Sequence, residues 1–574
     1  MLKDSKIWIG TSSEGPVFML PEMANRHGLI SGATGTGKTV SLQVLAEAFS
    51  SLGVPVFMAD IKGDIAGMAK PGELNTKIQE RMRICGLDNF KPKAFPVIFW
   101  DVFGTSGHPV RATVSEMGPL LLGRMLNLNE TQTGVLYLVF RIADDEGMLL
   151  IDLKDLRAML AYVGERASQY TINYGNISKS SIGAIQRAIA ILEDQGGNNF
   201  FGEPALQIND WLRQDDEKRG IVNILAADKL FLRPNLYSSF MLWMLGELYE
   251  LLPECGDSGL PRMVFFFDEA HLLFEDCPKA LLEQIELTIR LIRSKGVGVF
   301  FITQNPTDIP SKVLSQLAAR VQHALRAFTP QEIKIVKSVA QTFRENETFN
   351  TEEAILSLGT GEALLSFLQE DGTPSVTQRA TILPPQSSIG VISDSLRTTL
   401  IDASELIGKY DNSFDRESAY EILSEKYISQ GIAATNVLQE NAKDEQSLYT
   451  TSFSKRSFKV FDPDTGTYVE SVVEMPTAAV ETKEINIPNQ TIYAPQSESL
   501  VKQTPPPVLV YNTKTQQYEP KQLAQSERKE RAAKKTKSIG EKMLDNFTRS
   551  TASGAGYTVG RSISRGILGV FGIK

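Results

Sequence analysis

Eight consecutive residues near the N-terminus have the types and spacing of a phosphate-binding loop. They follow the apolar pair Leu29–Ile30 and are Gly32, Ala33, Thr34, Gly35, Thr36, Gly37, Lys38 and Thr39. Glycines let backbone N–H groups fold around phosphate oxygens, and the helix expected next adds positive potential at its N-terminus. Lys38 would reach the β- and γ-phosphates, and the Thr39 hydroxyl would ligate Mg²⁺. The segment therefore predicts a nucleoside triphosphate site.

A second group of candidate catalytic side chains follows an apolar run later in the chain. The run Met263–Phe267 predicts a buried strand of a parallel sheet, and Asp268 and Glu269 come directly after it. The aspartate would hold Mg²⁺, and the glutamate would orient or deprotonate the attacking water. Taken alone, the pair also fits an acidic helix cap. Beside a phosphate loop, we interpret it as the metal ligand and the base.

Two further strand ends carry polar side chains. Gln304 follows the apolar run Val299–Thr303, where its amide would contact the γ-phosphate or its water and sense hydrolysis. A polar strand end before the turn at Pro306 is the alternative. Asp60–Asp64 ends an earlier strand at the edge where such sheets bind ligands. A role beside the site, a surface facing a polynucleotide and a plain turn all remain open for it.

Arginines and histidines complete the candidate set. Phosphoryl transfer benefits from a cation on the developing charge, and a neighbouring subunit often supplies it. The candidates are Arg290, Arg293, Arg320 and Arg326. Each also fits a solvated residue that forms salt bridges. His271 and His323 fit core or supporting roles better than metal ligation.

The elements that must position these residues alternate between strands and helices. Residues 1–110 contain short apolar runs, with a helix-like stretch at Thr39–Leu52 between the first two. Strand-like runs return after residue 216. Strand, helix and strand in this order predict an α/β fold with a mostly parallel central sheet.

Composition shifts divide the chain into segments. We expect an ATPase core in 1–112 and 216–385, a helical insertion in 113–215, a helical extension in 386–440 with a helix over 401–430, a low-complexity linker in 441–530, and a basic segment in 531–574. We expect the tail beyond the extension to be largely disordered. In the linker, 460–468 and 510–518 resemble each other, which fits two small hairpins and equally fits chance.

Charge and composition exclude several classes of protein. The 574 residues carry a formal net charge of −9, yet the stretch from Lys521 onward holds 12 Lys and Arg against 4 Asp and Glu. A basic tail on an acidic body is a boundary signal and a candidate anion-binding element. Three cysteines and four histidines argue against a disulfide scaffold and a zinc site. No apolar run is long enough for a signal peptide or a spanning helix, so we expect a cytoplasmic protein without integral membrane association.

The sequence resembles the HerA–FtsK superfamily of P-loop motor ATPases, and most closely the bacterial HerA-like proteins. The matching pieces are NRHGLISGATGTGKT, PVFMADIKGD, VFFFDEAH, RSKGVGVFFITQNPTDIP and LAARVQHALRAF, which span roughly residues 1–385. The resemblance implies a RecA-like fold, a hexameric ring, ATP and Mg²⁺ as ligands, and ATP-driven movement on DNA. It makes Asp268 and Glu269 the Walker B pair and Gln304 the sensor. It places Arg293 and Arg320 where arginines act across the subunit interface, without choosing between them.

Two departures from the family limit what the resemblance implies. Only 31 residues precede Gly32, too few for the barrel domain of archaeal HerA proteins, so a nuclease partner has no support in this sequence. The insertion at 113–215 also lengthens the gap between the Walker elements. The letters DEAH suggest a DEAH-box helicase. That class needs a second RecA domain with a Gln-x-x-Gly-Arg-x-Gly-Arg motif, and the sequence after residue 300 contains no such motif.

Three functions compete on this basis. The leading one is a ring-forming DNA translocase or helicase that hydrolyses ATP. The alternatives are an ATP-driven assembly or secretion-coupling ATPase whose cargo is not bare DNA, and a nucleotide-dependent switch that binds partners. Glu269 and the arginines favour turnover over the switch.

Overall fold

The computed structural model describes residues 1–429, apart from 257, 258, 276 and 278, together with the strands of two hairpins further along the chain. The chain divides into two compact units, of which the first is Met1–Lys426 with Gly556–Lys574 and the second is Tyr427–Ala555. The predictions of a disordered tail and of a basic segment at 531–574 lie outside the described residues.

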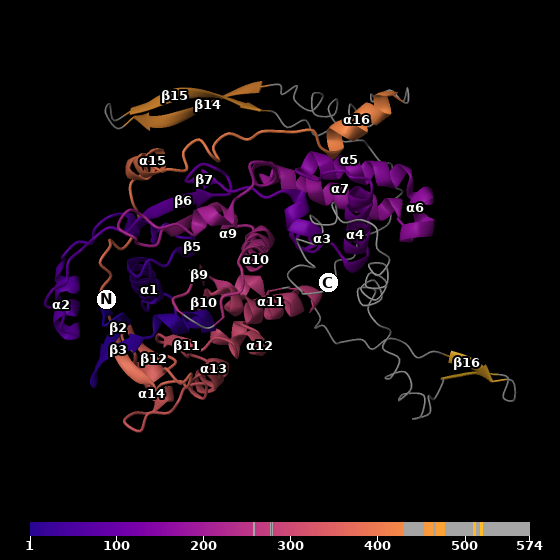
Figure 1. Cartoon of the computed structure of the whole chain (residues 1–574). Coiled ribbons are helices and arrows are strands. Elements are labelled where there is room, and N and C mark those ends of the chain that lie inside the picture. The colour runs from indigo at the N-terminus through magenta and orange to yellow at the C-terminus, as the bar shows by residue number, and fades with distance from the viewer. Residues whose placement is uncertain are drawn as a thin grey trace. The chain divides into compact units, whose positions relative to one another are not determined.

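The strands of the first unit form one 13-stranded sheet (Figure 1). They are β1 (Leu2–Lys3), β2 (Lys6–Ser12), β3 (Gly15–Met19), β4 (Gly28–Ser31), β5 (Val56–Asp60), β6 (Val97–Asp101), β7 (His108–Pro109), β8 (Val222–Ala226), β9 (Met263–Phe267), β10 (Val297–Thr303), β11 (Ala319–Gln322), β12 (Glu362–Ser366) and β13 (Gln378–Ile382). Their order is β1-β2-β13-β12-β11-β4-β10-β9-β5-β8-β6-β7, with β3 beside β2. All pairs from β11 to β7 are parallel, and the pairs on the β12 side are antiparallel. The prediction of an α/β fold with a mostly parallel sheet is confirmed.

The helices of the described part lie in the connections between these strands, except α15 and α16, which follow β13. The α-helices are α1 (Lys38–Ser51), α2 (Thr76–Cys85), α3 (Val114–Met125), α4 (Glu130–Asp145), α5 (Leu153–Glu165), α6 (Ala167–Tyr174), α7 (Lys179–Asp194), α8 (Gly197–Phe200), α9 (Asp228–Phe231), α10 (Pro234–Leu251), α11 (Lys279–Ile292), α12 (Ser311–Leu314), α13 (Pro330–Ala340), α14 (Thr351–Ser357), α15 (Asp394–Asp402) and α16 (Ala419–Ser429). Short 3₁₀ turns are η1 (Pro21–Arg26), η2 (Ala66–Ala69), η3 (Ile208–Trp211), η4 (Ala270–Leu273), η5 (Arg293–Lys295) and η6 (Pro306–Asp308). None of these described helices is long and apolar enough to cross a membrane.

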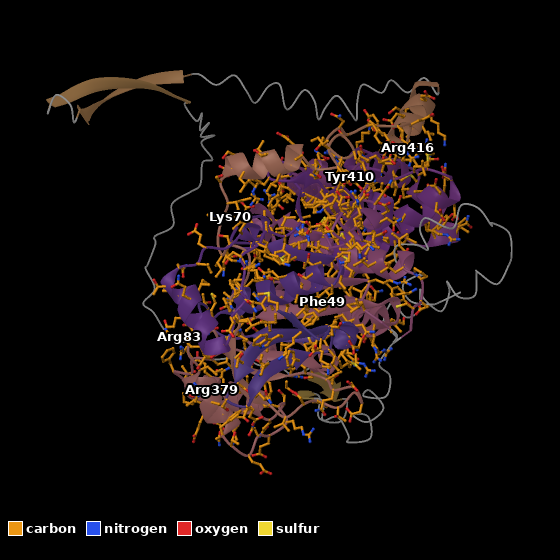
Figure 2. All side chains as sticks on the ribbon, turned by 60° about the vertical axis from the view of Figure 1, so that its left-hand side comes forward. Phe49, Lys70, Arg83, Arg379, Tyr410 and Arg416 are labelled. Carbon is orange, nitrogen blue, oxygen red and sulfur yellow. The ribbon has the colours of Figure 1, made fainter. Side chains whose placement is uncertain are left out.

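The central strands are buried on both faces, and their aromatic side chains show how. Phe266 of β9 packs on Phe300 of β10 with ring centres 5.3 Å apart, and Phe300 lies 6.3 Å from Phe49 of α1. On the opposite face, Phe265 lies 4.3 Å from the ring of Phe57. Successive strand residues point to opposite faces, so an uninterrupted apolar run fills two cores at once. Figure 2 shows Phe49 deep among the packed side chains.

Residues between β7 and β8 contribute a bundle of helices beside the sheet. Figure 1 shows α3, α4, α5, α6 and α7 gathered there. Three of these helices begin with a reciprocal capping box, at Thr113, Asn129 and Asp152. Such caps satisfy backbone N–H groups that have no partner within the helix. The apolar spacing of the insertion and its polar caps together account for these helices.

The chain after β13 is helical over only part of the predicted range 401–430: the prediction holds for α16 and is wrong for residues 403–418. Helix α15 ends at Asp402, and α16 begins only at Ala419. Between them, Gly408 adopts a φ of +80°, and its N–H donates to the Asp411 carboxylate. A left-handed glycine and a turn-forming aspartate interrupt the helix that the flanking spacing suggested.

In the second unit, both copies of the weak repeat lie in antiparallel strand pairs. Strand β14 (Phe453–Asp462) pairs with β15 (Thr467–Pro476), and β16 (Leu509–Asn512) pairs with β17 (Gln517–Pro520). In each copy, the aromatic residue of the first strand lies opposite the tyrosine of the second: Phe461 pairs with Tyr468, and Tyr511 pairs with Tyr518.

Candidate functional site

The glycine-rich loop connects β4 to α1 and depends on glycine at specific positions. Gly32 has a φ of +150° and Gly37 a φ of +116°, values that side chains disfavour. A Cβ atom at Gly32 would lie 2.6 Å from the Cβ of His323, and one at Gly37 would lie 3.2 Å from the backbone of Gly361. The loop therefore needs glycine both for its backbone angles and for its close approach to neighbouring strands.

Two strands flank β4 and hold the start of the loop. The N–H of Gly32 donates to the carbonyl of Thr303 at the end of β10 (3.3 Å). The N–H of Ala33 donates to the carbonyl of Ala324, just beyond β11 (2.8 Å). All three strands are parallel, so their carboxyl ends meet at the edge where ligands bind in such sheets.

Lys38 lies over the loop that it would help to fill. Its ammonium donates to the carbonyls of Gly32 (2.6 Å) and Ala33 (3.1 Å). Burial lowers the pKa of Lys38, and the charges of Glu269 and Asp268 act against that change. The lysine and the acidic pair, predicted separately from the sequence, are thus within electrostatic reach of one another.

Glu269 and Gln304 contact each other and the phosphate loop. The Gln304 amide donates to Glu269 Oε1 (3.3 Å), and the Thr34 hydroxyl donates to Gln304 Oε1 (3.3 Å). Glu269 is buried, and its Oε2 has no hydrogen-bond partner among the described residues, although His271 Nδ1 lies 3.5 Å away. A buried carboxylate oxygen without a donor is placed to accept one from a water molecule.

Asp268 occupies the position expected for a metal ligand. Burial raises the pKa of its carboxyl group to about 7, and the charge of Glu269 adds to the effect. Its carbonyl accepts a hydrogen bond from the hydroxyl of the buried Tyr237 in α10 (2.8 Å), which supports this strand end. A bound cation would favour the ionised carboxylate. Thr39 lies in the first turn of α1, and its hydroxyl and the Asp268 carboxylate are the kinds of oxygen ligand that suit Mg²⁺.

The turn Asp60–Asp64 borders the same site. The pairing of Met58 with Phe266 sets Asp60 beside Asp268 at the strand ends. Asp60 is buried, and burial followed by the charge of Asp64 raises its pKa to about 6. The charge of Lys62 partly opposes the rise in the pKa of Asp268 that burial causes. This location agrees with a role beside the site, and the turn itself is stabilised by the bond from the Ala66 N–H to Asp60 (3.0 Å).

The two arginines carried over from the family lie on the flanks of different strands: Arg293 is in η5, before the amino end of β10, and Arg320 lies in β11 opposite Leu29 of β4. Burial lowers the pKa of the nearby His27 to about 4, and the charge of Arg293 adds to that effect. Arg320 lies within β11, and its guanidinium donates to Thr342 Oγ1 and to the Leu314 carbonyl (both 3.3 Å) beside a cavity of about 30 Å³. The other two candidates, Arg290 and Arg326, are exposed.

His323 supports the loop, as its sequence position indicated. Its Nε2 lies 2.8 Å from the Ser41 hydroxyl, and its Nδ1 lies 2.9 Å from the Glu362 carbonyl. Burial lowers its pKa to about 4, so the imidazole is neutral at pH 7. The ring therefore acts as a hydrogen-bonded spacer between α1 and β12.

Sequence reasoning missed the turn before β12. The Gly361 N–H donates to the carbonyl of Thr36 in the loop (2.9 Å). Arg81 of α2 holds this turn through the carbonyls of Gly361 (2.9 Å) and Thr360 (3.1 Å). The only local signal was the Gly359–Thr360–Gly361 triplet, which does not reveal a contact with a residue over 300 positions away.

The chain was compared with protein families, with curated protein sequences and with solved structures. A family model described as "Helicase HerA-like C-terminal" matches residues 6–491. A comparison with curated protein sequences gives no significant match.

Among solved structures, the chain is similar to the conjugative coupling protein TrwB. The unbound monoclinic form has 14% identity and a TM-score of 0.45 over 68% of this chain and 92% of that one. TrwB in complex with ADP and Mg²⁺ has 17% identity and a TM-score of 0.42 over 66% and 91%. VirB4 of Thermoanaerobacter pseudethanolicus has 14% identity and a TM-score of 0.41 over 67% and 97%.

Proposed function

The chain belongs to the HerA-like helicase C-terminal family, and from that premise we propose that it is an ATP-hydrolysing, ring-forming motor that moves DNA. The family match confirms the resemblance to HerA–FtsK ATPases that the motifs indicated. The observation that carries the proposal is the chain of contacts from Thr34 through Gln304 to Glu269, because it joins a phosphate loop to a candidate base.

The roles of the residues follow from their positions. The loop N–H groups and the start of α1 would bind the phosphates, and Lys38 would exchange its bonds to Gly32 and Ala33 for phosphate oxygens. Glu269 would accept a proton from the attacking water through its unpaired oxygen, with Gln304 holding the other oxygen in place.

Thr39 and Asp268 fit Mg²⁺, because one is a hydroxyl in the first turn after the loop and the other a carboxylate whose burial a cation would offset. When bound, the ion neutralises charge on the β- and γ-phosphates.

Arg293 and Arg320 would act on the site of a neighbouring subunit, as the family resemblance implies. Arg293→Ala or Arg320→Ala should then keep nucleotide binding and lose hydrolysis. Mixing that variant with Glu269→Gln should restore activity at mixed interfaces. A fully active monomer in analytical ultracentrifugation would contradict a hexameric ring.

The proposed cargo is DNA, and stimulation of ATPase activity tests it. We expect double- or single-stranded DNA to raise the steady-state rate of ATP hydrolysis, and Lys38→Ala to abolish both the basal and the stimulated rate. A basal rate that no DNA changes would contradict the DNA motor and favour an assembly or secretion-coupling ATPase.

A further inference from the structure

The segment after β11, residues 323–329, forms one side of the phosphate loop. Its Ala324 carbonyl accepts the hydrogen bond from the Ala33 N–H (2.8 Å). Leu325 turns inward and is buried in the cluster formed with α13 and α14. The first residues of the segment are therefore fixed both to the loop and to a packed core, and its later residues reach the surface.

This side of the loop is opposite the candidate catalytic residues. The strands run β9, β10, β4 and β11 across the sheet, so Glu269 and Gln304 lie beyond one flank of β4 and Ala324 beyond the other. An ATP molecule whose γ-phosphate faces Glu269 directs its nucleoside away from β9 and β10. The nucleoside would then extend towards the flank of β4 on which the segment after β11 meets the loop.

Phe328 is the phenylalanine of this segment, and the residue is 85% exposed. Its backbone is held firmly, because its N–H and that of Thr329 both donate to the Glu332 carboxylate (2.8 Å each) in the capping box of α13. It lies four positions after Ala324, a reach of at most about 14 Å in extended chain. That reach is of the order of the length of a nucleoside diphosphate.

We propose that Phe328 is the stacking platform for the purine base of the bound nucleotide. This inference rests on the proposed binding of ATP and adds the residue that recognises its base. Aromatic stacking uses the face of a base and not its hydrogen-bonding edge, so the platform holds guanine as well as adenine. The phosphates remain the task of the loop and Lys38.

The test compares ATP with inorganic tripolyphosphate, which has the phosphates and no base. Affinities of both are measured by calorimetry on the full chain for wild type, Phe328→Ala, Phe328→Tyr and Ile333→Ala. Phe328→Ala should bind ATP about 10-fold more weakly and tripolyphosphate unchanged. Phe328→Tyr should restore ATP affinity. Ile333→Ala removes an exposed apolar side chain from the same helix region and should change neither.

Two results would overturn the stacking platform. Equal ATP affinity in wild type and Phe328→Ala would remove the base contact, and equal loss of ATP and tripolyphosphate would make the residue a support of the loop. A change in sedimentation with unchanged ATP affinity would assign Phe328 to a contact with a second copy. Wild-type protein that binds neither ligand would instead refute the proposed function.

Discussion

Two groups of carboxylates differ in how completely their oxygens are hydrogen-bonded. One group lies at the nucleotide edge of the sheet, and the other joins α5 to the chain that follows the sheet. At the nucleotide edge, Asp60 Oδ1 and Glu269 Oε2 have no hydrogen-bond partner among the described residues. Burial raises the pKa of Asp60 to about 6 and that of Asp268 to about 7. Among the described residues, Asp60 Oδ1 and Glu269 Oε2 have no hydrogen-bond partner that would offset the cost of burying them.

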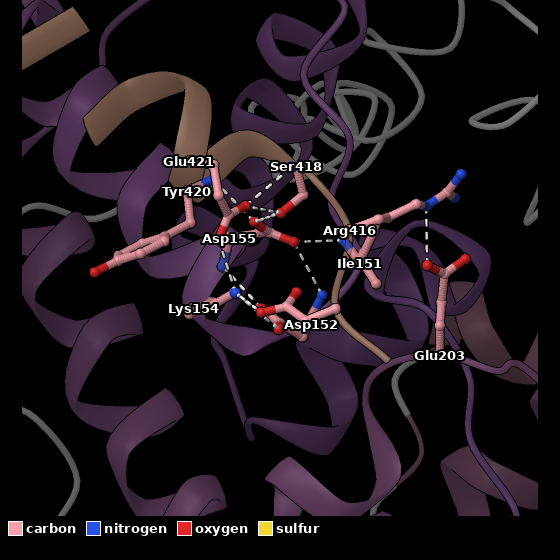
Figure 3. A network of polar contacts seen from close by, with 10 residues as sticks. Ile151, Asp152, Lys154, Asp155, Glu203, Arg416, Ser418, Tyr420 and Glu421 are labelled. Atoms are coloured by element: carbon pink, nitrogen blue, oxygen red, sulfur yellow. Dashed lines mark hydrogen bonds and ion pairs between the residues drawn. The ribbon is translucent and has the colours of Figure 1, made fainter. Parts of the chain in front are cut away.

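The second group, which we name the clasp, joins α5 to the start of α16 and consists of Asp152, Lys154, Asp155, Ser418 and Glu421 (Figure 3). Asp155 is fully buried, and both its oxygens accept bonds: from the N–H groups of Ile151 (2.8 Å) and Asp152 (3.2 Å), and from Ser418 Oγ (2.5 Å) and the Tyr420 N–H (2.9 Å).

The difference in hydrogen bonding indicates that the clasp serves stability and that the carboxylates at the nucleotide edge serve ligand binding. A fully bonded carboxylate stabilises the fold, whereas an under-bonded one leaves interaction capacity for a ligand. Removing a charge should therefore have opposite consequences at the two places.

The largest expected effect is on catalysis at the nucleotide edge. Glu269→Gln should lower kcat for ATP hydrolysis about 1000-fold, because the amide cannot accept the proton from water. ATP affinity and Tm should stay near wild type, since the side chain's unpaired oxygen contributes little to folding. Steady-state hydrolysis, calorimetric binding and thermal unfolding measure these three quantities. Hydrolysis at the wild-type rate would show that Glu269 is not the base.

At the clasp, the expected effect is on stability. Asp155→Ala should lower the free energy of unfolding by about 3 kcal/mol, because it leaves buried donors unpaired. Denaturant titration measures the loss, with Lys279→Ala as a control that removes an exposed ion pair to Glu283 (3.7 Å). Nucleotide affinity at low temperature should be unchanged. A Tm equal to wild type would mean that the clasp does not hold this segment.

A smaller effect is expected at Glu421, with a defined pH dependence. Burial acts to raise its pKa, but the bonds from Lys154 and Ser418 outweigh burial and lower it to about 2. Since the folded-state pKa lies below the ordinary 4.5, the charge stabilises the fold above pH 4.5 and this contribution is lost as the pH falls towards 2. Glu421→Gln should cost about 1 kcal/mol at pH 7 and progressively less below pH 4.5. A penalty independent of pH would contradict the ion pair as its source.

The smallest effect has the opposite sign and concerns Asp60. Its folded-state pKa of about 6 lies above the ordinary 3.8, so the folded protein holds a proton that the unfolded chain releases. Stability from this group is present below pH 3.8 and is lost as the pH rises through 6. Asp60→Asn should therefore raise the Tm of the nucleotide-free protein at pH 8 by roughly 1–2 °C and leave it unchanged near pH 4. A lower Tm at pH 8 would show that Asp60 stabilises the fold as an anion.

The sequence by itself determined the elements and the types of side chain at the site. The phosphate loop, the acidic pair and Gln304 each follow directly after a short apolar run, so their signals lie within one segment of chain. Backbone angles, burial on two faces and helix starts depend mainly on neighbouring residues, and such features are readable from spacing.

The tertiary structure alone decided which segments meet. It brought Gln304 to Glu269, Gly361 to Thr36 and Ser418 to Asp155. The helix expected over 401–430 failed at residues 403–418 because that segment is bonded to distant elements, with Tyr410 donating to Asp210 and packing 5.5 Å from the ring of Trp100. Contacts between residues hundreds of positions apart depend on how the layers pack, and no local pattern of residue types encodes that distance.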